Sequence, residues 1–339
     1  MDFYSLPTEL VTAIVKMVGK IWGLPIAITS SRLKAIVFYL NYNKVRHSLS
    51  LYSSTTTWAD ITMILTSYGH SLCQTAARTG HLSMLQWARA NGCPWDERVC
   101  AQAAYSGHLA VLQWARANGC EWSIATCNSA ASNGHLAVLQ WARANGCWWN
   151  EYTCAIAAYK GHLAVLQWAR ANGCPWDDIT CASAARGGHL EVLQWARTNG
   201  CPWNDQTCEN AVEYGHLAVL QWARANGCEW GTYYTCTLAA GQGHLAILQW
   251  TRANGCAWDH FTCSNAARGG HLAVLQWLRA NGCPWNAATC STAAWNGHLA
   301  VIQWARANGC LWDKYTLRNA IVNGHVNTVK WLRANGCPT

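Results

Sequence analysis

From about residue 70 onward the pattern of apolar and polar positions repeats, and a Gly-His pair marks each copy. The glycines of these pairs stand at positions 80, 107, 134, 161, 188, 215, 243, 270, 297 and 324, a spacing of 27 residues with one step of 28. Each pair opens the segment HLAVLQWARANGC or a near copy, for example His108 to Cys120. A fixed period of this length is typical of stacked repeat proteins. We therefore assign ten repeats to residues 70–339.

Each repeat is predicted to form two short helices. The first helix begins one position after a Trp, where most repeats carry a residue type that favours a helix N-cap. These residues are Asp96, Ser123, Asn150, Asp177, Asn204, Gly231, Asp259, Asn286 and Asp313. The first helix should end at the Gly before His, which suits a left-handed C-terminal position. The second helix carries Leu109, Leu112 and Ala115 at helical spacing and should end at Asn118-Gly119.

Helices of this length must stack, because isolated helices below about 12 to 15 residues are marginal in water. The first helix offers small side chains, such as Cys100, Ala103 and Ala104, that allow a neighbouring helix to approach closely. The larger Leu, Val and Trp side chains of the second helix then fill the layer. The pattern predicts an all-α solenoid of about ten two-helix repeats.

The repeat consensus TCxxAAxxGHLAVLQWxRANGC resembles the TPLHxAAxxGHxxVVxxLLxxGA core of the ankyrin repeat. Ala130-Ala131 and Gly134-His135 align with the family's AA and GH pairs, Cys127 takes the place of its Leu, and Gly146-Cys147 that of its Gly-Ala. The repeat is about six residues shorter than an ankyrin repeat. The resemblance thus implies ankyrin-like repeats whose hairpin is shortened to a tight NGCPW loop. This Trp- and Cys-rich form is similar to ankyrin-type proteins of giant DNA viruses of amoebae.

The 19 cysteines form two series along the repeats. Ten follow Asn-Gly, from Cys93 to Cys337, and nine lie in the first helices, from Cys73 to Cys290. The tenth repeat has Leu317 at the second series, and leucine neither binds zinc nor forms a disulfide. A structural zinc site usually needs a CxxC knuckle, and no export signal favours a disulfide framework. We expect small buried thiols, with neither a bound metal nor a cofactor.

The histidine of the Gly-His pair recurs from His81 to His325 without a carboxylate in register. Ten copies of one catalytic histidine would be unusual, and the resemblance implies a role in capping and in hydrogen bonds between repeats. The chain has no Walker loop, no GxGxxG and no HExxH motif. We therefore expect no enzymatic activity.

An arginine recurs in every second helix, from Arg89 to Arg333, and such a row suits phosphate groups. However, charged residues make up 12% of the chain, and 24 Lys and Arg are offset by 16 Asp and Glu. The preferred interpretation is a solvated outer face, which disfavours nucleic acid as a partner. No apolar run approaches the roughly 18 residues of a membrane span. With Asp2 and Glu9 where a secretory signal would be basic, we expect an intracellular protein of the host cytoplasm.

Variation between repeats concentrates in the first helix, after the N-cap, after the cysteine and before Gly-His. Tyr, Trp and Arg are frequent anchors of protein interfaces, although aromatic side chains that lie along neighbouring repeats would explain some of these positions equally well. The one-residue insertion at 231–234 should bulge this surface. The predicted protein-binding residues are Arg98, Tyr105, Tyr152, Tyr159, Arg186, Tyr214, Tyr233, Tyr234, Phe261, Arg268, Trp295 and Tyr315.

Residues 1–69 lack the repeat and read as short helices, which we assign to a separate N-terminal segment. Part of this segment resembles the start of an F-box, the motif that docks onto the Skp1 adaptor of a cullin-type ubiquitin ligase, although Gly23 stands where an acidic residue is common and the later Trp is missing. The F-box-like docking residues are Leu6, Pro7, Leu10, Ile14, Leu24 and Leu33. The alternative is that these helices cap the array, as terminal repeats must.

These observations predict a non-catalytic protein-interaction scaffold that delivers a client of unknown identity to a ubiquitin ligase. The competing hypothesis is a structural protein that self-associates or joins a virion. A nucleic-acid-binding solenoid is the least favoured of the three interpretations.

Overall fold

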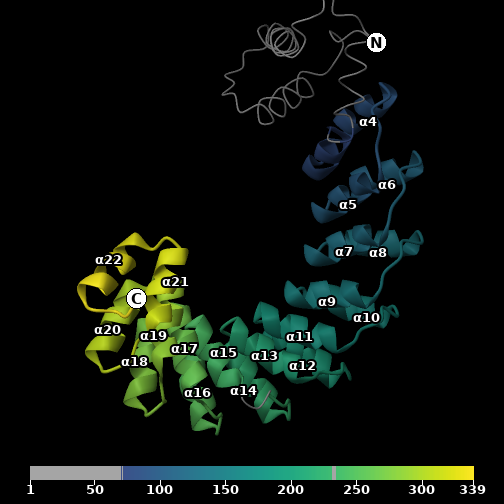
Figure 1. The fold of residues 1–339 in the computed structure, drawn as a ribbon. Coiled ribbons are helices and arrows are strands. Elements are labelled where there is room, and N and C mark those ends of the chain that lie inside the picture. The colour runs from purple at the N-terminus through teal and green to yellow at the C-terminus, as the bar shows by residue number, and fades with distance from the viewer. Residues whose placement is uncertain (1–69, 71, 231–233) are drawn as a thin grey trace, which may run out of the picture. The chain divides into compact units, whose positions relative to one another are not determined.

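The computed structural model describes residues 70, 72–230 and 234–339, and every regular element in these ranges is an α-helix (Figure 1). Two short helices recur in each described repeat, and an irregular loop instead of a hairpin of strands joins one repeat to the next. The predicted fold class, an all-α repeat with shortened loops, is confirmed. The predictions for Tyr233, for the cap at Gly231 and for the F-box-like residues of segment 1–69 concern positions outside the described residues.

The observed helix boundaries lie close to the predicted ones. Residues 72–79 are helical and belong to the first repeat. The first helices of the later repeats are α5 (Glu97–Tyr105), α7 (Ile124–Ser132), α9 (Glu151–Tyr159), α11 (Asp178–Gly187), α13 (Asp205–Glu213), α15 (Thr235–Gln242), α17 (His260–Arg268), α19 (Ala287–Trp295) and α21 (Lys314–Val322). The second helices are α4 (Leu82–Ala90), α6 (Leu109–Ala117), α8 (Leu136–Ala144), α10 (Leu163–Ala171), α12 (Leu190–Thr198), α14 (Leu217–Ala225), α16 (Leu245–Ala253), α18 (Leu272–Ala280), α20 (Leu299–Ala307) and α22 (Val326–Ala334). None of the described helices is long and apolar enough to cross a membrane.

The chain divides into two compact units. One contains the described residues up to Ala130 together with Ala137–Trp148, and the other contains Ala131–Leu136 together with Trp149–Thr339. Within the second unit, the first helices α9, α11, α13, α15, α17, α19 and α21 contact one another in succession (Figure 1). Each of them also contacts the second helix of its own repeat. The first helices therefore form one layer and the second helices form the other.

The core lies between these two layers and is built from small side chains on one side and branched ones on the other. In α5, Cys100, Ala103 and Ala104 are fully buried, as the sequence predicted. In α6, Leu112 is also fully buried, but Leu109 is only partly buried, and Val111 is buried in the core instead. Burial of apolar area, at about 25 cal/mol per Å², is the main term that holds such short helices in place.

Local signals set the two ends of each first helix. Asp177 accepts a hydrogen bond from the backbone N–H of Ile179 at 3.1 Å, and Asn204 caps α13 in the same way. These bonds satisfy amide groups that a helix N-terminus otherwise leaves unpaired. At the other end, Gly188 has φ +76°, and an added Cβ would lie 2.6 Å from the ring of His216 in the next repeat. Glycine is therefore required there both for the turn and for the close stacking of repeats.

Candidate protein-interaction surface

The first helices leave a fixed set of positions outside the core. In α11, Cys181, Ala184 and Ala185 are buried, whereas Ile179 and Arg186 are exposed. The equivalents of the three buried residues are also buried in the first helices on either side, because all repeats share one helical register. Sequence variation therefore falls on exposed side chains, while the buried side chains stay nearly constant.

The predicted binding residues that the structure describes are all exposed. The aromatic side chains among them are exposed by 36% to 59%, and they are Tyr105, Tyr152, Tyr159, Tyr214, Tyr234, Phe261, Trp295 and Tyr315. Arg98, Arg186 and Arg268 are exposed as well. These side chains are therefore accessible to a partner, and their role in binding stays a prediction.

The arginine row of the second helices is not the freely solvated face that the sequence suggested. The Arg306 guanidinium donates a hydrogen bond to the carbonyl oxygen of Cys310 at 2.6 Å, and its Cζ lies 4.0 Å from the centre of the Trp312 ring. That ring makes an edge-to-face contact with Trp331 of the next repeat. Equivalent Arg–Trp pairs join Arg89 to Trp95, Arg116 to Trp122, Arg170 to Trp176, Arg197 to Trp203, Arg224 to Trp230, Arg252 to Trp258 and Arg279 to Trp285. The row thus holds loops in place by cation–π contacts and charged hydrogen bonds.

The histidine series links adjacent repeats, as expected, but does not cap helices through its side chains. The Nε2–H of His216 donates to the carbonyl oxygen of Arg186 at 3.1 Å, and that of His298 donates to the carbonyl oxygen of Arg268 at 3.0 Å. Each of these histidines stands at a helix N-cap, and neither side chain makes a cap hydrogen bond. The capping role was therefore wrong, because the imidazole points to the preceding repeat and not to its own helix.

All 19 cysteines are buried free thiols. In α11, a hydrogen bond with Cys201 and burial both raise the pKa of the Cys181 thiol well above its usual range. The thiol of Cys201 also donates to the carbonyl oxygen of Asp177 at 3.3 Å, which ties the loop to the first helix of the preceding repeat. Within residues 70, 72–230 and 234–339, no three His, Cys, Asp or Glu side chains are grouped as metal ligands. The thiols thus act as small packed groups.

Three exposed side chains of adjacent repeats form a stack that sequence analysis did not detect. The Cζ of Arg186 lies 5.4 Å from the centre of the Tyr159 ring and 4.9 Å from the centre of the Tyr214 ring. The Nζ of Lys160 lies 4.9 Å from the Tyr159 ring. The sequence identified the aromatic residues one by one, but it does not reveal which positions of neighbouring helices face each other.

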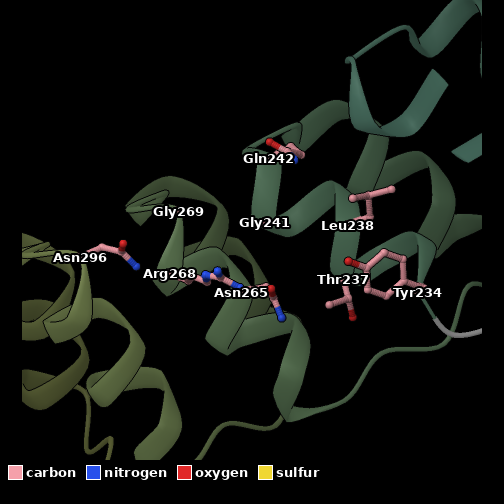
Figure 2. Close-up of a pocket in the computed structure, with 9 residues that line it drawn as sticks. All are labelled: Tyr234, Thr237, Leu238, Gly241, Gln242, Asn265, Arg268, Gly269 and Asn296. Atoms are coloured by element: carbon pink, nitrogen blue, oxygen red, sulfur yellow. The ribbon is translucent and has the colours of Figure 1, made fainter. Parts of the chain in front are cut away.

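A hollow of about 360 Å³ lies over α15, α17 and α19, on the same layer of first helices (Figure 2). It contains two of the predicted residues, Tyr234 and Arg268. In Figure 2, Tyr234, Thr237 and Leu238 lie toward one end of the hollow, while Arg268 and Asn296 lie toward the other. The other lining residues were not among the predicted ones, and they are Thr237, Leu238, Gly241, Gln242, Asn265, Gly269 and Asn296. The signal that could have revealed the hollow is Gly241, because the equivalent position of every other repeat carries a side chain, which is Tyr, Trp or Arg in six of them.

An acidic group lies on α13, the first helix that packs against α15. Burial, together with the neighbouring charges of Asp205 and Glu213, raises the pKa of the Glu209 carboxyl above its ordinary value. The exposed layer of first helices therefore carries separate negative and positive regions and not one continuous basic stripe.

Comparison with known proteins yields only remote structural likenesses. No model of a known protein family matches the chain, and no curated protein sequence matches it. Among solved structures, the human ASB11 ankyrin repeat domain shares 16% identity with a TM-score of 0.43, over 52% of this chain and 96% of that one. The pentatricopeptide repeat protein PPR10, solved in complex with an 18-nt psaJ RNA element, shares 15% identity with a TM-score of 0.43 over 91% of this chain. That match spans 55% of the length of PPR10, and neither likeness assigns the chain to a family. The chain itself is a helical repeat protein, as its paired helices establish.

Proposed function

We propose that this chain is a non-catalytic scaffold that binds a protein client through the exposed positions of its first helices. One observation carries the proposal: the buried positions of the repeats are nearly uniform, whereas the exposed positions of the first helices vary and are rich in aromatic and Arg residues. The uniform buried positions are explained by the packing that every repeat requires. Variable exposed anchors are what selective recognition of a protein surface requires.

The competing nucleic-acid interpretation receives less support from the contacts. A surface that tracks phosphates needs several free cations in series. The arginines of the second helices instead lie over Trp rings and bond to loop carbonyls, as the Arg306–Trp312 pair illustrates. The acids of α13 interrupt any basic path along the first helices.

The experiment compares capture of proteins from an amoebal lysate, the source that the resemblance to giant-virus repeats suggests. The test variant replaces Phe261 and Trp295 by Ser, and the control replaces Trp148 and Leu311 by Ser. The control side chains are 79% and 70% exposed, but they lie in the loops between repeats. We expect a discrete set of proteins, quantified by mass spectrometry, to be lost with the test variant and retained with the control. Equal loss with both variants would indicate nonspecific apolar adhesion and would reject the proposal.

The adaptor role is a further part of this proposal, supported by the F-box-like residues of the N-terminal segment. Leu6, Pro7 and Leu10 are the residues that we expect to contact Skp1. Purified Skp1 should bind the full chain, and Leu10→Asp should abolish that binding. If Skp1 is not retained by the unaltered chain, the adaptor role is rejected, and the client-binding proposal stands by itself.

A further inference from the structure

We propose that the hollow around Arg268 binds the side-chain carboxylate of an Asp or Glu in an extended segment of the protein client. The inference rests on the proposed function and specifies the chemistry that one part of the surface recognises. It follows from a comparison between two arginines that occupy the same position in different repeats.

Arg186 and Arg268 are each followed by Gly-Gly-His, and both lie in the last turn of the first helix of their repeats. The Arg186 guanidinium is covered by Tyr159 on one side and Tyr214 on the other. Around Arg268 the corresponding positions hold Gly241 and Asn296. Among the described residues no carboxylate pairs with the Arg268 guanidinium, and no ring lies over it. Its hydrogen-bonding capacity is therefore available to a ligand.

The hollow exists because Gly241 has no side chain. A Cβ at that position would lie 3.4 Å from the Cβ of Asn265, an ordinary contact, so the backbone does not require glycine there. Gly269, in contrast, is required by the fold, since its Cβ would lie 2.5 Å from the carbonyl oxygen of Gly241. Gly241 is thus the one glycine of the hollow whose replacement tests the space without forcing the helices apart.

The polar groups of the hollow suit a carboxylate. The guanidinium of Arg268 supplies several N–H donors in a planar fork that matches two carboxylate oxygens. The amide of Asn265 donates one hydrogen to the carbonyl oxygen of Phe261 at 2.9 Å, and its NH₂ group keeps a second. The side-chain amide of Gln242 also lines the hollow, and none of the lining residues is acidic (Figure 2).

The opposite end of the hollow is apolar enough to hold the stem of a peptide side chain. Leu238 and the ring of Tyr234 lie there, away from Arg268 (Figure 2). A volume of about 360 Å³ is at the lower end of the range for ligand sites. It accommodates one or two side chains of an extended peptide and not a folded element.

A phosphate backbone is a poorer occupant of the same hollow. Arg268 is the only cation among its lining residues. The neighbouring acids Asp205, Glu209 and Glu213 lie on α13, where a continuing chain of phosphates would meet repulsion. A peptide carries its charges singly and avoids that repulsion. The positive hollow beside a negative helix therefore favours a peptide.

The test uses a displayed library of random 12-residue peptides, selected on the full chain and counter-selected on the Gly241→Tyr variant. We expect the enriched peptides to share an Asp or Glu at one fixed position. In a synthetic copy of an enriched peptide, replacing that residue by Gln or Asn should weaken binding about 10- to 100-fold, the range for a charge-assisted pair. Amidation of the peptide C-terminus should have no effect, because the carboxylate comes from a side chain.

Variants of the protein locate the effect. Arg268→Gln should weaken binding of the acidic peptide by the same factor and should leave binding of the Gln or Asn peptide unchanged. Gly241→Tyr should also weaken it, because a ring would fill the hollow and cover Arg268. Lys330→Gln serves as the matched control, since it removes one exposed cation from α22, outside the surface. Circular dichroism and the unfolding midpoint establish whether each variant is folded. If Gly241→Tyr does not fold, Arg268→Gln still tests the proposal.

Several results would overturn this inference. They are an enriched set without a fixed acid, affinity that is indifferent to Arg268→Gln, or displacement of the peptide by a single-stranded oligouridylate RNA. Peptides that need Phe261 and Trp295 but not Arg268 would reject the carboxylate hollow and leave the proposed function standing. Loss of client capture in the Phe261 and Trp295 variant tests the proposed function separately.

Discussion

The stack of Tyr159, Arg186 and Tyr214 and the hollow around Arg268 are the same architecture with different exposed residues. In both places an arginine lies in the last turn of a first helix, and the sequence Gly-Gly-His follows it. In both, the next histidine of the series bonds to the carbonyl oxygen of that arginine, at 3.1 Å and 3.0 Å. Two tyrosines close the first site, and a glycine and an asparagine leave the second open. Exposed positions can therefore change the character of the surface without altering the repeat beneath it.

The largest expected effect concerns the glycines that the two sites share. Gly187→Ala would place a Cβ 2.2 Å from the carbonyl oxygen of Tyr159, and Gly269→Ala would place one 2.5 Å from that of Gly241. Each should lower the free energy of unfolding by about 1–3 kcal/mol, because adjacent repeats must separate to make room. Gly241→Ala is the matched control and should not destabilise the chain. Urea unfolding of the full chain measures all three, and an equal loss for Gly241→Ala would show that the sites do not differ as described.

A smaller effect is expected from the arginines that brace the loops. Arg306→Met should lower the free energy of unfolding by about 1–2 kcal/mol, through loss of the contact with Trp312 and of the hydrogen bond to Cys310. Arg306→Lys keeps the charge but loses the planar fork, so its loss should be intermediate. If Arg306→Met unfolds at the same urea concentration as the unaltered chain, the arginines of the second helices do not stabilise the loops and form a solvated face.

Comparison of Arg186→Met with Arg268→Met addresses the two sites directly. Arg186→Met should cost about 0.5–1 kcal/mol, because exposed cation–π contacts with two rings are lost. Arg268→Met should change the free energy of unfolding by less than about 0.5 kcal/mol, as expected for a surface side chain without partners. Parallel urea titrations give the difference, and a larger loss for Arg268→Met would contradict the open hollow.

The smallest effect is a pH dependence that the two sites have in common. Burial lowers the pKa of His189 and of His271 below the ordinary value of 6.5. Below pH 6.5 the unfolded chain therefore binds more protons than the folded chain, and the free energy of unfolding falls as the pH falls toward the lowered pKa. We therefore expect the free energy of unfolding to decrease as the pH is lowered from about 7 to below 6.5. Urea titrations at several pH values would measure the decrease. The double variant His189→Gln with His271→Gln should flatten this slope, and an unchanged slope would contradict the assignment.

The fold was predictable because its signals are local and recur in register. Helix caps such as Asp177, the Gly-His turn and the small face of Cys181, Ala184 and Ala185 each act within a few residues. Stacking multiplies the same interface, so one repeat describes most of the core. The role of the arginine row was harder to predict. A guanidinium and a Trp six positions later, such as Arg306 and Trp312, meet only because the loop between them turns back over the helix.

The sequence by itself determined the repeat, its two helices, the burial of the thiols and the positions at which the surface varies. All of these follow from spacing and residue type along a short stretch of chain. Only the tertiary structure decided that Arg186 is enclosed by rings and that Arg268 faces a hollow. The physical reason is that these surroundings come from the repeats before and after each arginine, at positions brought together by stacking. Whether an exposed charge is satisfied depends on those neighbours and not on its own sequence context.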